Sequence, residues 1–261
     1  DDVAIAAPLT KYSVSITDGE RISEFVDRAW KIAISGYPGG VHLSMPVDIM
    51  FSSFDENAML DERPFDRTAK MPPRAWPCPE DLSAVMDIIQ NASRPLIIGG
   101  HGVWWSRSEE KLEAVGRTLR IPVFNVPYHQ KLMGEEFEAY MGLADIHQYA
   151  PSKVALQESD VVIMVGARLD NQMNFGNPPF IPQSTRLICV NGSHEELEFN
   201  RAADLALLSD PGAFFDALAQ IKPFDRQWFD LNRRLRGEWV DQMLADIPEL
   251  EDDKIHPLNL A

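Results

Sequence analysis

The sequence is poor in cysteine, in basic residues and in long apolar runs. Its two cysteines, Cys78 and Cys189, are too few for a disulfide framework or a cysteine-rich metal site. Twenty-four basic residues stand against forty acidic ones, and the formal charge of −16 repels a phosphate backbone, so no nucleic acid partner is expected. No apolar run approaches the ~18 residues of a membrane span, so no membrane partner is expected either.

The start of the chain shows no targeting signal. Asp1-Asp2-Val3 lacks the basic and apolar regions of a signal peptide, and an initiator methionine is missing. Because the two cysteines form no disulfide framework, we expect a reducing, cytoplasmic location. From the missing methionine we expect a piece of a longer chain. With 261 residues, of which 45% are hydrophobic, the piece can bury the core of one large or two small domains.

The first part of the sequence predicts the end of an α/β domain. Apolar residues fall on one face of a helix over Arg21–Ser35, and Val41–Val47 alternates like a strand. We expect the remaining strands of that sheet before residue 1, so residues 1–50 are interpreted as the C-terminal piece of a preceding domain. Residues 51–78, which are charged and rich in proline, are interpreted as a linker.

The second part alternates strands with helices, which favours the α/β class and a doubly wound parallel sheet over residues 79–222. Residues 223–261 are interpreted as a C-terminal helix and a linker. The expected strands are Pro95–Gly99, Ile121–Val126, Asp160–Val165, Arg186–Val190 and Leu205–Leu208. The expected helices are Pro79–Asn91, Ser108–Leu119, Ala150–Glu158, Ser193–Asn200, Asp210–Ile221 and Arg226–Ala245.

Three strand ends carry small or polar residues. Gly99-Gly100-His101-Gly102, Gly166-Ala167-Arg168 and Asn191-Gly192 each follow an apolar strand. Ligands of open α/β sheets bind outside the carboxyl ends of the strands, where glycine turns let backbone amides approach a phosphate and an arginine can pair with an anion. If the three ends are neighbours, they form one crevice. The alternative is a set of tight turns with a surface arginine.

Several motifs together resemble one family. They are Gly-Gly-His-Gly at 99–102, Leu-Arg-Ile-Pro-Val at 119–123, Gln-Glu-Ser-Asp-Val-Val at 157–162, Gly-Ala-Arg-Leu-Asp at 166–170 and Asn-Arg at 200–201. This set is similar to the central domain of thiamine-diphosphate enzymes, in the branch of acetolactate synthase, 2-hydroxyacyl-CoA lyase and oxalyl-CoA decarboxylase. The Gly-Tyr-Pro-Gly-Gly at 36–40 is similar to the end of that family's pyrimidine-binding domain, and Ile-His-Pro at 255–257 to the entry into its pyrophosphate-binding domain.

The resemblance implies a nucleotide site in the central domain, which holds FAD or ADP in relatives. The implied cofactor-binding residues are Gly99, Gly100, His101, Gly102, Gly166, Ala167, Arg168, Asn191 and Asp210. His101 stands where relatives usually have glycine or lysine and Asn191 where they usually have aspartate, so the adenosine end is altered or the site is empty. His129 and His147 flank a loop that, by the same resemblance, faces the flavin or the substrate.

The family's activating glutamate and its Gly-Asp-Gly motif for Mg²⁺ are not found in this sequence, so no catalytic residue and no metal site are predicted in this fragment. The resemblance implies thiamine diphosphate and Mg²⁺ in the full enzyme, a 2-keto acid or 2-hydroxyacyl-CoA type of substrate, and a homodimer or homotetramer. The Phe-Gly-Asn-Pro-Pro at 175–179 favours the lyase branch.

Three functions stay open from the sequence. The first is part of an enzyme that forms or cleaves a C–C bond next to a carbonyl. The second is a structural or regulatory module that binds ADP or FAD without catalysis of its own. The third is an empty scaffold domain that braces a dimer or tetramer.

Overall fold

The structure, a computed structural model, describes residues 1–54, 73–127, 132–134 and 136–246. The chain divides into two compact units, Asp1–Pro73 and Arg74–Ala261. Most of the predicted linker over 51–78, as well as His129 and the Ile255-His256-Pro257 motif, lies outside the described residues. None of the described helices is both long enough and apolar enough to cross a membrane.

The first unit contains a two-stranded parallel sheet. Its elements are α1 (Asp2–Ala6), η1 (Ala7–Leu9), β1 (Tyr12–Ser15), η2 (Gly19–Arg21), α2 (Ile22–Ile34), β2 (Val41–Ser44) and α3 (Val47–Met50). Strand β1 pairs with β2, with Val14 opposite Leu43. The sequence analysis placed all other strands of this sheet before residue 1 and therefore missed β1. All residues of both strands are only partly buried.

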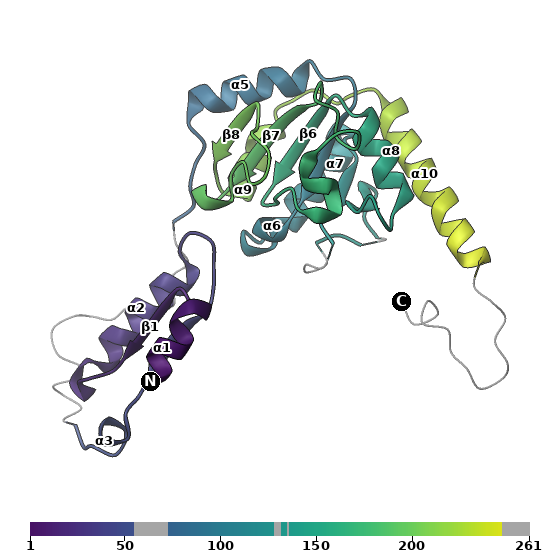
Figure 1. The fold of residues 1–261 in the computed structure, drawn as a ribbon. Coiled ribbons are helices and arrows are strands. Elements are labelled where there is room, and N and C mark those ends of the chain that lie inside the picture. Colours follow the sequence, from purple (N-terminus) through teal and green to yellow (C-terminus); the bar gives the residue numbers. More distant parts are fainter. Residues whose placement is uncertain (55–72, 128–131, 135, 247–261) are drawn as a thin grey trace. The chain divides into compact units, whose positions relative to one another are not determined.

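The second unit is a doubly wound α/β fold (Figure 1). Its strands are β3 (Pro95–Gly99), β4 (Val123–Asn125), β5 (Tyr140–Leu143), β6 (Val161–Val165), β7 (Arg186–Asn191) and β8 (Leu205–Leu208). Its helices are α5 (Pro79–Gln90), α6 (His101–Trp105), α7 (Glu109–Leu119), α8 (Ala150–Glu158), η3 (Asn171–Gly176), η4 (His194–Glu196), α9 (Pro211–Leu218) and α10 (Arg226–Ala245).

All six strands are parallel, in the order β5-β4-β3-β6-β7-β8. From β3 the chain builds outward to β5 and then returns to place β6 on the other side of β3. Helices α6, α7 and α9 contact one another, and α8 contacts α10, so two helical layers cover the sheet. Because the strand order reverses between β3 and β6, the ligand crevice of such a fold is expected at their carboxyl ends.

The core lies on both faces of the central strands. Every residue of β3 and β6 is buried, which agrees with their unbroken apolar sequences. Helix α10 also belongs to this unit, because the buried Trp228 donates from Nε1 to Pro95 O at 2.8 Å and Trp239 packs edge-on against Tyr149 at 4.7 Å between ring centroids. Strand β3 and helix α10 are thus directly hydrogen-bonded.

Some predicted elements differ from the structure. The helix expected over Ser193–Asn200 is only a short 3-10 turn, because Leu197 is extended and ends it at Glu196. The positive φ angles of Glu198 and Asn200, 55° and 73°, prevent a helix from continuing beyond that point. Ser108 precedes α7 as predicted, but its hydroxyl donates to Val103 O rather than capping the helix amides. The sequence analysis also missed α6 and β5.

Candidate functional site

The structure brings the three glycine- or asparagine-ended strands together. Strands β3, β6 and β7 are consecutive neighbours in the sheet. Gly99 lies opposite Val165, and Val165 lies opposite Val190, so the turns that follow these residues leave the sheet side by side. The condition set by the sequence, that the three ends be neighbours, is met at the switch point of the fold.

The glycine turn after β3 packs directly against the turn after β6. Gly100 N donates to Val165 O at 3.0 Å, and Gly102 N donates to Gly166 O at 2.9 Å. A Cβ atom on Gly102 would lie 2.6 Å from Gly166 Cα, and Gly166 itself has a φ of +59°. The glycines are therefore required for contact between two strand ends, and the amides of Gly100 and Gly102 bond within the protein.

His101 begins the short helix α6 and lies among aromatic rings. Its ring centroid is 5.3 Å from that of Trp104 and 5.9 Å from that of Trp105. The two tryptophans meet edge to face at 5.0 Å. His101 is thus part of a partly buried aromatic cluster.

Arg168 carries the positive charge of the crevice. Its Nη1 lies 3.6 Å from Glu196 Oε1, and its guanidinium carbon lies 5.2 Å from the centroid of the Phe199 ring. The side chain keeps 37% of its surface exposed, so it has room to bind a ligand as well. Its neighbour Ala167 lies against Gly100, where a Cβ would come within 2.6 Å.

A pocket of about 380 Å³ opens beside Arg168. This volume falls at the low end of the range of ~300–1000 Å³ that ligand pockets span. One wall follows β6 and another precedes β8, and Pro127, two residues after the end of β4, completes the lining. The lining residues are Pro127, Arg168, Asp170, Asn171, Gln172, Phe175, Phe199 and Asn200. The lining therefore combines a cation, a carboxylate, side-chain amides and two half-exposed phenylalanines.

The backbone of both walls is strained. Asn174 and Phe175 have φ angles of 50° and 55° on one wall, and Glu198 and Asn200 have 55° and 73° on the other. Asparagine tolerates this left-handed region, whereas a bulky residue such as Phe175 rarely adopts it. Such conformations persist only where surrounding contacts enforce them, and they cluster at ligand sites.

Asn191 is buried at the end of β7. Its Oδ1 accepts from Ser193 N at 3.1 Å, so the side chain closes its own turn. The side-chain oxygen of Asn191 is therefore engaged locally. It does not line the pocket as the structure describes it.

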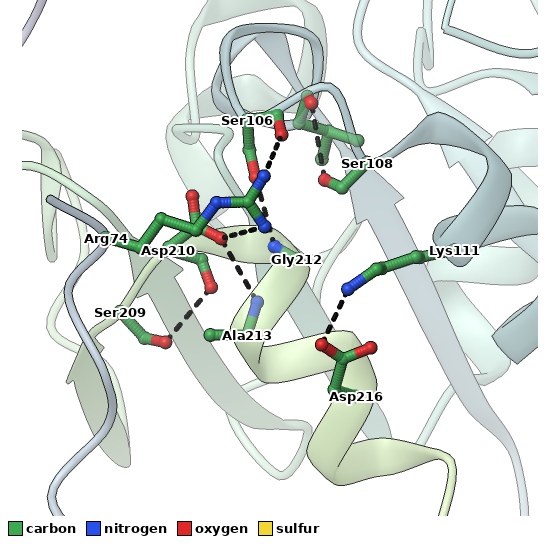
Figure 2. Close-up of polar contacts among 10 residues, drawn as sticks. Arg74, Ser106, Ser108, Lys111, Ser209, Asp210, Gly212, Ala213 and Asp216 are labelled. Carbon is green, nitrogen blue, oxygen red and sulfur yellow. Dashed lines mark hydrogen bonds and ion pairs between the residues drawn. The ribbon is translucent and has the colours of Figure 1, made fainter. Parts of the chain in front are cut away.

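Asp210 lies in a different polar cluster, at the start of α9 (Figure 2). Its Oδ1 accepts from Ala213 N at 3.1 Å and lies 3.7 Å from Arg74 Nη1. Arg74 Nη2 also reaches Ser106 O at 3.5 Å, and the Ser106 hydroxyl accepts from Gly212 N at 3.2 Å. Asp210 thus caps a helix and anchors the segment that begins the second unit.

Of the residues predicted to form the site, Arg168 is the one that lines the described pocket. His147 lies close by, since its Nε2 is 3.2 Å from Asn171 O. The sequence analysis did not assign Asn171, Gln172, Phe199 or Asn200 to the site, although all four follow the ends of β6 or β7. Within the described part of the chain, no three His, Cys, Asp or Glu side chains are grouped closely enough to hold a metal ion.

Comparison with known proteins identifies the second unit. Residues 82–218 match the family model described as thiamine pyrophosphate enzyme, central domain. The chain is 28% identical to a 2-hydroxyacyl-CoA lyase of Arabidopsis thaliana over 216 residues, which cover 80% of this chain and 36% of the lyase. It is 26% identical to a probable acetolactate synthase large subunit of Methanococcus aeolicus, with 80% of this chain and 35% of the synthase covered.

The fold agrees with these matches. The crystal structure of benzoylformate decarboxylase from Polynucleobacter necessarius superposes with a TM-score of 0.69 at 21% identity, over 87% of this chain and 41% of the decarboxylase. The chain therefore spans little more than a third of the length of the two relatives named above. Because the family model covers more than half of the sequence, the chain belongs to the thiamine pyrophosphate enzyme family, whose central domain it contains.

Proposed function

We propose that this chain supplies the central part of a thiamine-diphosphate-dependent enzyme that forms or cleaves a C–C bond next to a carbonyl. The observation that carries the proposal is the central-domain match over residues 82–218. The relative named as 2-hydroxyacyl-CoA lyase supports a substrate of the 2-hydroxyacyl-CoA type, and the resemblance to acetolactate synthase implies a 2-keto acid as the other type. The Phe-Gly-Asn-Pro-Pro at 175–179 favours the lyase type. Nothing in the matches favours a nucleotide-binding module without catalysis.

In this proposal the described residues bind and position, and they do not react. Thiamine diphosphate, when bound, supplies the ring that stabilises a carbanion next to the carbonyl, and Mg²⁺ holds its phosphates. We assign neither group to the described residues, because these gather no cluster of metal ligands. We further propose a homodimer or homotetramer in the cytoplasm, where Cys78 and Cys189 stay unpaired, as they are in the structure.

For the central domain we propose a nucleotide site, with FAD or ADP as ligand, whose anionic part lies in the pocket beside Arg168. The fit is partial. A guanidinium stacked on Phe199, next to the amides of Asn171 and Asn200, suits a phosphate joined to a flat ring. The glycine turn contributes shape rather than hydrogen bonds, since the amides of Gly100 and Gly102 are already used.

The nucleotide site is tested by titrating ADP and FAD into the wild-type chain and into Arg168→Ala. We expect the loss of a charge-assisted contact to weaken binding roughly tenfold or more. Arg94→Ala is the matched control, because Arg94 pairs with Glu158 beside the opposite, amino ends of the strands. Unchanged affinity in Arg168→Ala would show that the ligand binds elsewhere.

The enzymatic proposal is tested on the complete protein supplied with thiamine diphosphate and Mg²⁺. One reaction receives a 2-keto acid such as pyruvate, and another receives a 2-hydroxyacyl-CoA. We expect turnover of one of them that disappears when thiamine diphosphate is left out. A complete protein that binds ADP but converts neither substrate would support the binding module without catalysis instead.

A further inference from the structure

The guanidinium of Arg201 binds four main-chain carbonyl oxygens of a single segment. Nη1 donates to Gly176 O at 2.7 Å and to Ile181 O at 3.2 Å. Nη2 donates to Pro182 O at 3.3 Å and to Thr185 O at 3.5 Å. The planar fork of arginine presents several N–H groups in fixed directions, which a lysine cannot reproduce. Arg201 therefore fixes the path of residues 176–185, where the chain has no strand and no α-helix.

The contacts of Arg201 differ from those of the other arginines around it. Arg168 and Arg186 each lie within ion-pair distance of a carboxylate. Within the described part of the chain, Arg201 instead donates its side-chain hydrogen bonds to carbonyl oxygens, and its side chain is partly buried. A partly buried cation is stabilised by such dipoles only while all of them keep their positions. The segment and the arginine thus hold each other in place.

The segment held by Arg201, residues 176–185, directly follows the residues that form one wall of the pocket. Gly176, whose carbonyl accepts the shortest of the four bonds, has a φ of +76° and follows Asn174 and Phe175, which also have positive φ. A Cβ on Gly176 would lie 2.6 Å from Leu169 Cδ1 and 3.1 Å from Arg201 Cδ, so the turn is closely packed. The strained backbone of Phe175 is therefore enforced from its carboxyl side by Arg201.

The residues just before Arg201 form the other wall. Phe199 and Asn200 line the pocket, and Asn200 Nδ2 donates to Leu169 O at 2.6 Å. Two bonds from consecutive residues, Asn200 to Leu169 and Arg201 to Gly176, thus connect the wall before β8 with the wall after β6. The distance between Phe175 and Phe199, and so the width of the pocket, depends on both bonds.

We propose that Arg201 is a positioning residue that sets the shape of the pocket beside Arg168 without contacting the ligand. The proposal rests on the nucleotide site proposed above and adds the residue that determines which ligand shape the site accepts. The signal was present in the sequence as the Asn-Arg motif at 200–201, but its role depends on contacts with residues 16 to 25 positions away along the chain.

The test compares Arg201→Met and Arg201→Lys with the wild type by calorimetric titration of ADP. We expect Arg201→Met to raise the dissociation constant by roughly tenfold or more, by analogy with the loss in affinity when a supporting contact of a metal site is removed. Arg201→Lys restores part of the affinity, since it keeps the charge but fewer of the four bonds. The control, Arg186→Met, removes the ion pair to Asp204 at the amino end of β7 and leaves the affinity unchanged.

The stoichiometry of the titration separates positioning from stability. Irreversibly misfolded chains lower the ADP bound per chain and leave the dissociation constant at the wild-type value. Reversible unfolding raises the apparent dissociation constant only by the inverse of the folded fraction, which urea unfolding of the variant measures. A displaced wall raises the dissociation constant beyond that factor. A wild-type dissociation constant in Arg201→Met, with or without a lower stoichiometry, overturns the inference.

A second measurement does not depend on ADP. Amide hydrogen exchange in Arg201→Met should rise over residues 171–185 and stay unchanged over β7. If the wild type binds no ADP, the nucleotide proposal fails, and this exchange pattern alone decides on Arg201. Unchanged exchange over residues 171–185 would contradict the proposed positioning role of Arg201.

Discussion

Replacing Gly102 by alanine would place a methyl group inside the contact between the two central strand ends. The new Cβ would lie 2.6 Å from Gly166 Cα and 3.3 Å from Gly166 O. Carbon atoms in contact prefer ~3.5–4.0 Å, so the overlap is about 1 Å. The neighbour cannot swing away as a side chain would, because it is backbone bonded to Gly102 N and, through Gly166 N, to Val190 O at 2.8 Å.

The expected cost follows from this overlap. Overpacking of a closely packed site typically destabilises by ~1–3 kcal/mol. Alanine recovers a few tenths of that by restricting the unfolded chain. We therefore expect a net loss of about 1.5 kcal/mol in the free energy of unfolding of the second unit, which corresponds to a fall in Tm of ~3–6 °C for a unit of this size.

The assay is thermal and urea unfolding of the wild type, Gly102→Ala and a matched control, Gly237→Ala. Gly237 is exposed in α10, and no atom lies within 4 Å of the position that its Cβ would occupy. The control should gain about 0.5–1 kcal/mol, because alanine favours the helix. The two substitutions are chemically identical, so equal shifts of the same sign would refute the close contact between Gly102 and Gly166.

Three further outcomes are expected. Burial raises the pKa of the Glu113 carboxyl. The stabilisation of the fold by protonated Glu113 is therefore present below the ordinary glutamate pKa and is lost as pH rises through the raised pKa. Glu113→Gln should raise Tm at neutral pH and not in acid, and a change in Tm that is the same at every pH would contradict this. Burial also raises the pKa of the Cys189 thiol to about 11, whereas Cys78 is exposed. Iodoacetamide should therefore modify Cys78 first, as measured by mass spectrometry. Equal rates of modification would show that β7 opens to solvent. Asp210→Ala removes the cap of α9 and should lower the free energy of unfolding by ~0.5–2 kcal/mol in urea, whereas the milder Asp210→Asn keeps an acceptor and should lose less.

The central strands were predictable because their continuous apolar sequences indicate burial on both faces of the sheet. Pro95–Gly99 and Val161–Val165 are unbroken apolar runs, and only a strand covered on both faces buries such a run completely. Short strands with mixed residues were missed. Tyr12–Ser15 and Tyr140–Leu143 are strands because a partner strand lies beside them, which no local pattern records.

The candidate site was predictable in its location and not in its lining. Glycines after β3 and β6 mark the switch point, and the structure places both turns there. The pocket walls, by contrast, depend on backbone at positive φ, at Phe175 and Glu198, which side chains of these types rarely adopt. These conformations are enforced by bonds such as Asn200 to Leu169, 31 positions apart, and a helix was therefore expected where the chain turns instead.

The packing of α10 determines where the second unit can be cut for recombinant expression. The family match ends at residue 218, yet Trp228, Phe229 and Trp239 beyond it pack against the core or against residues of the sheet layer. A fragment that stops at 222 would leave Pro95 O without its indole donor and uncover Tyr149. Such a fragment should aggregate on purification, whereas one that continues through Ala245 keeps its last apolar face covered.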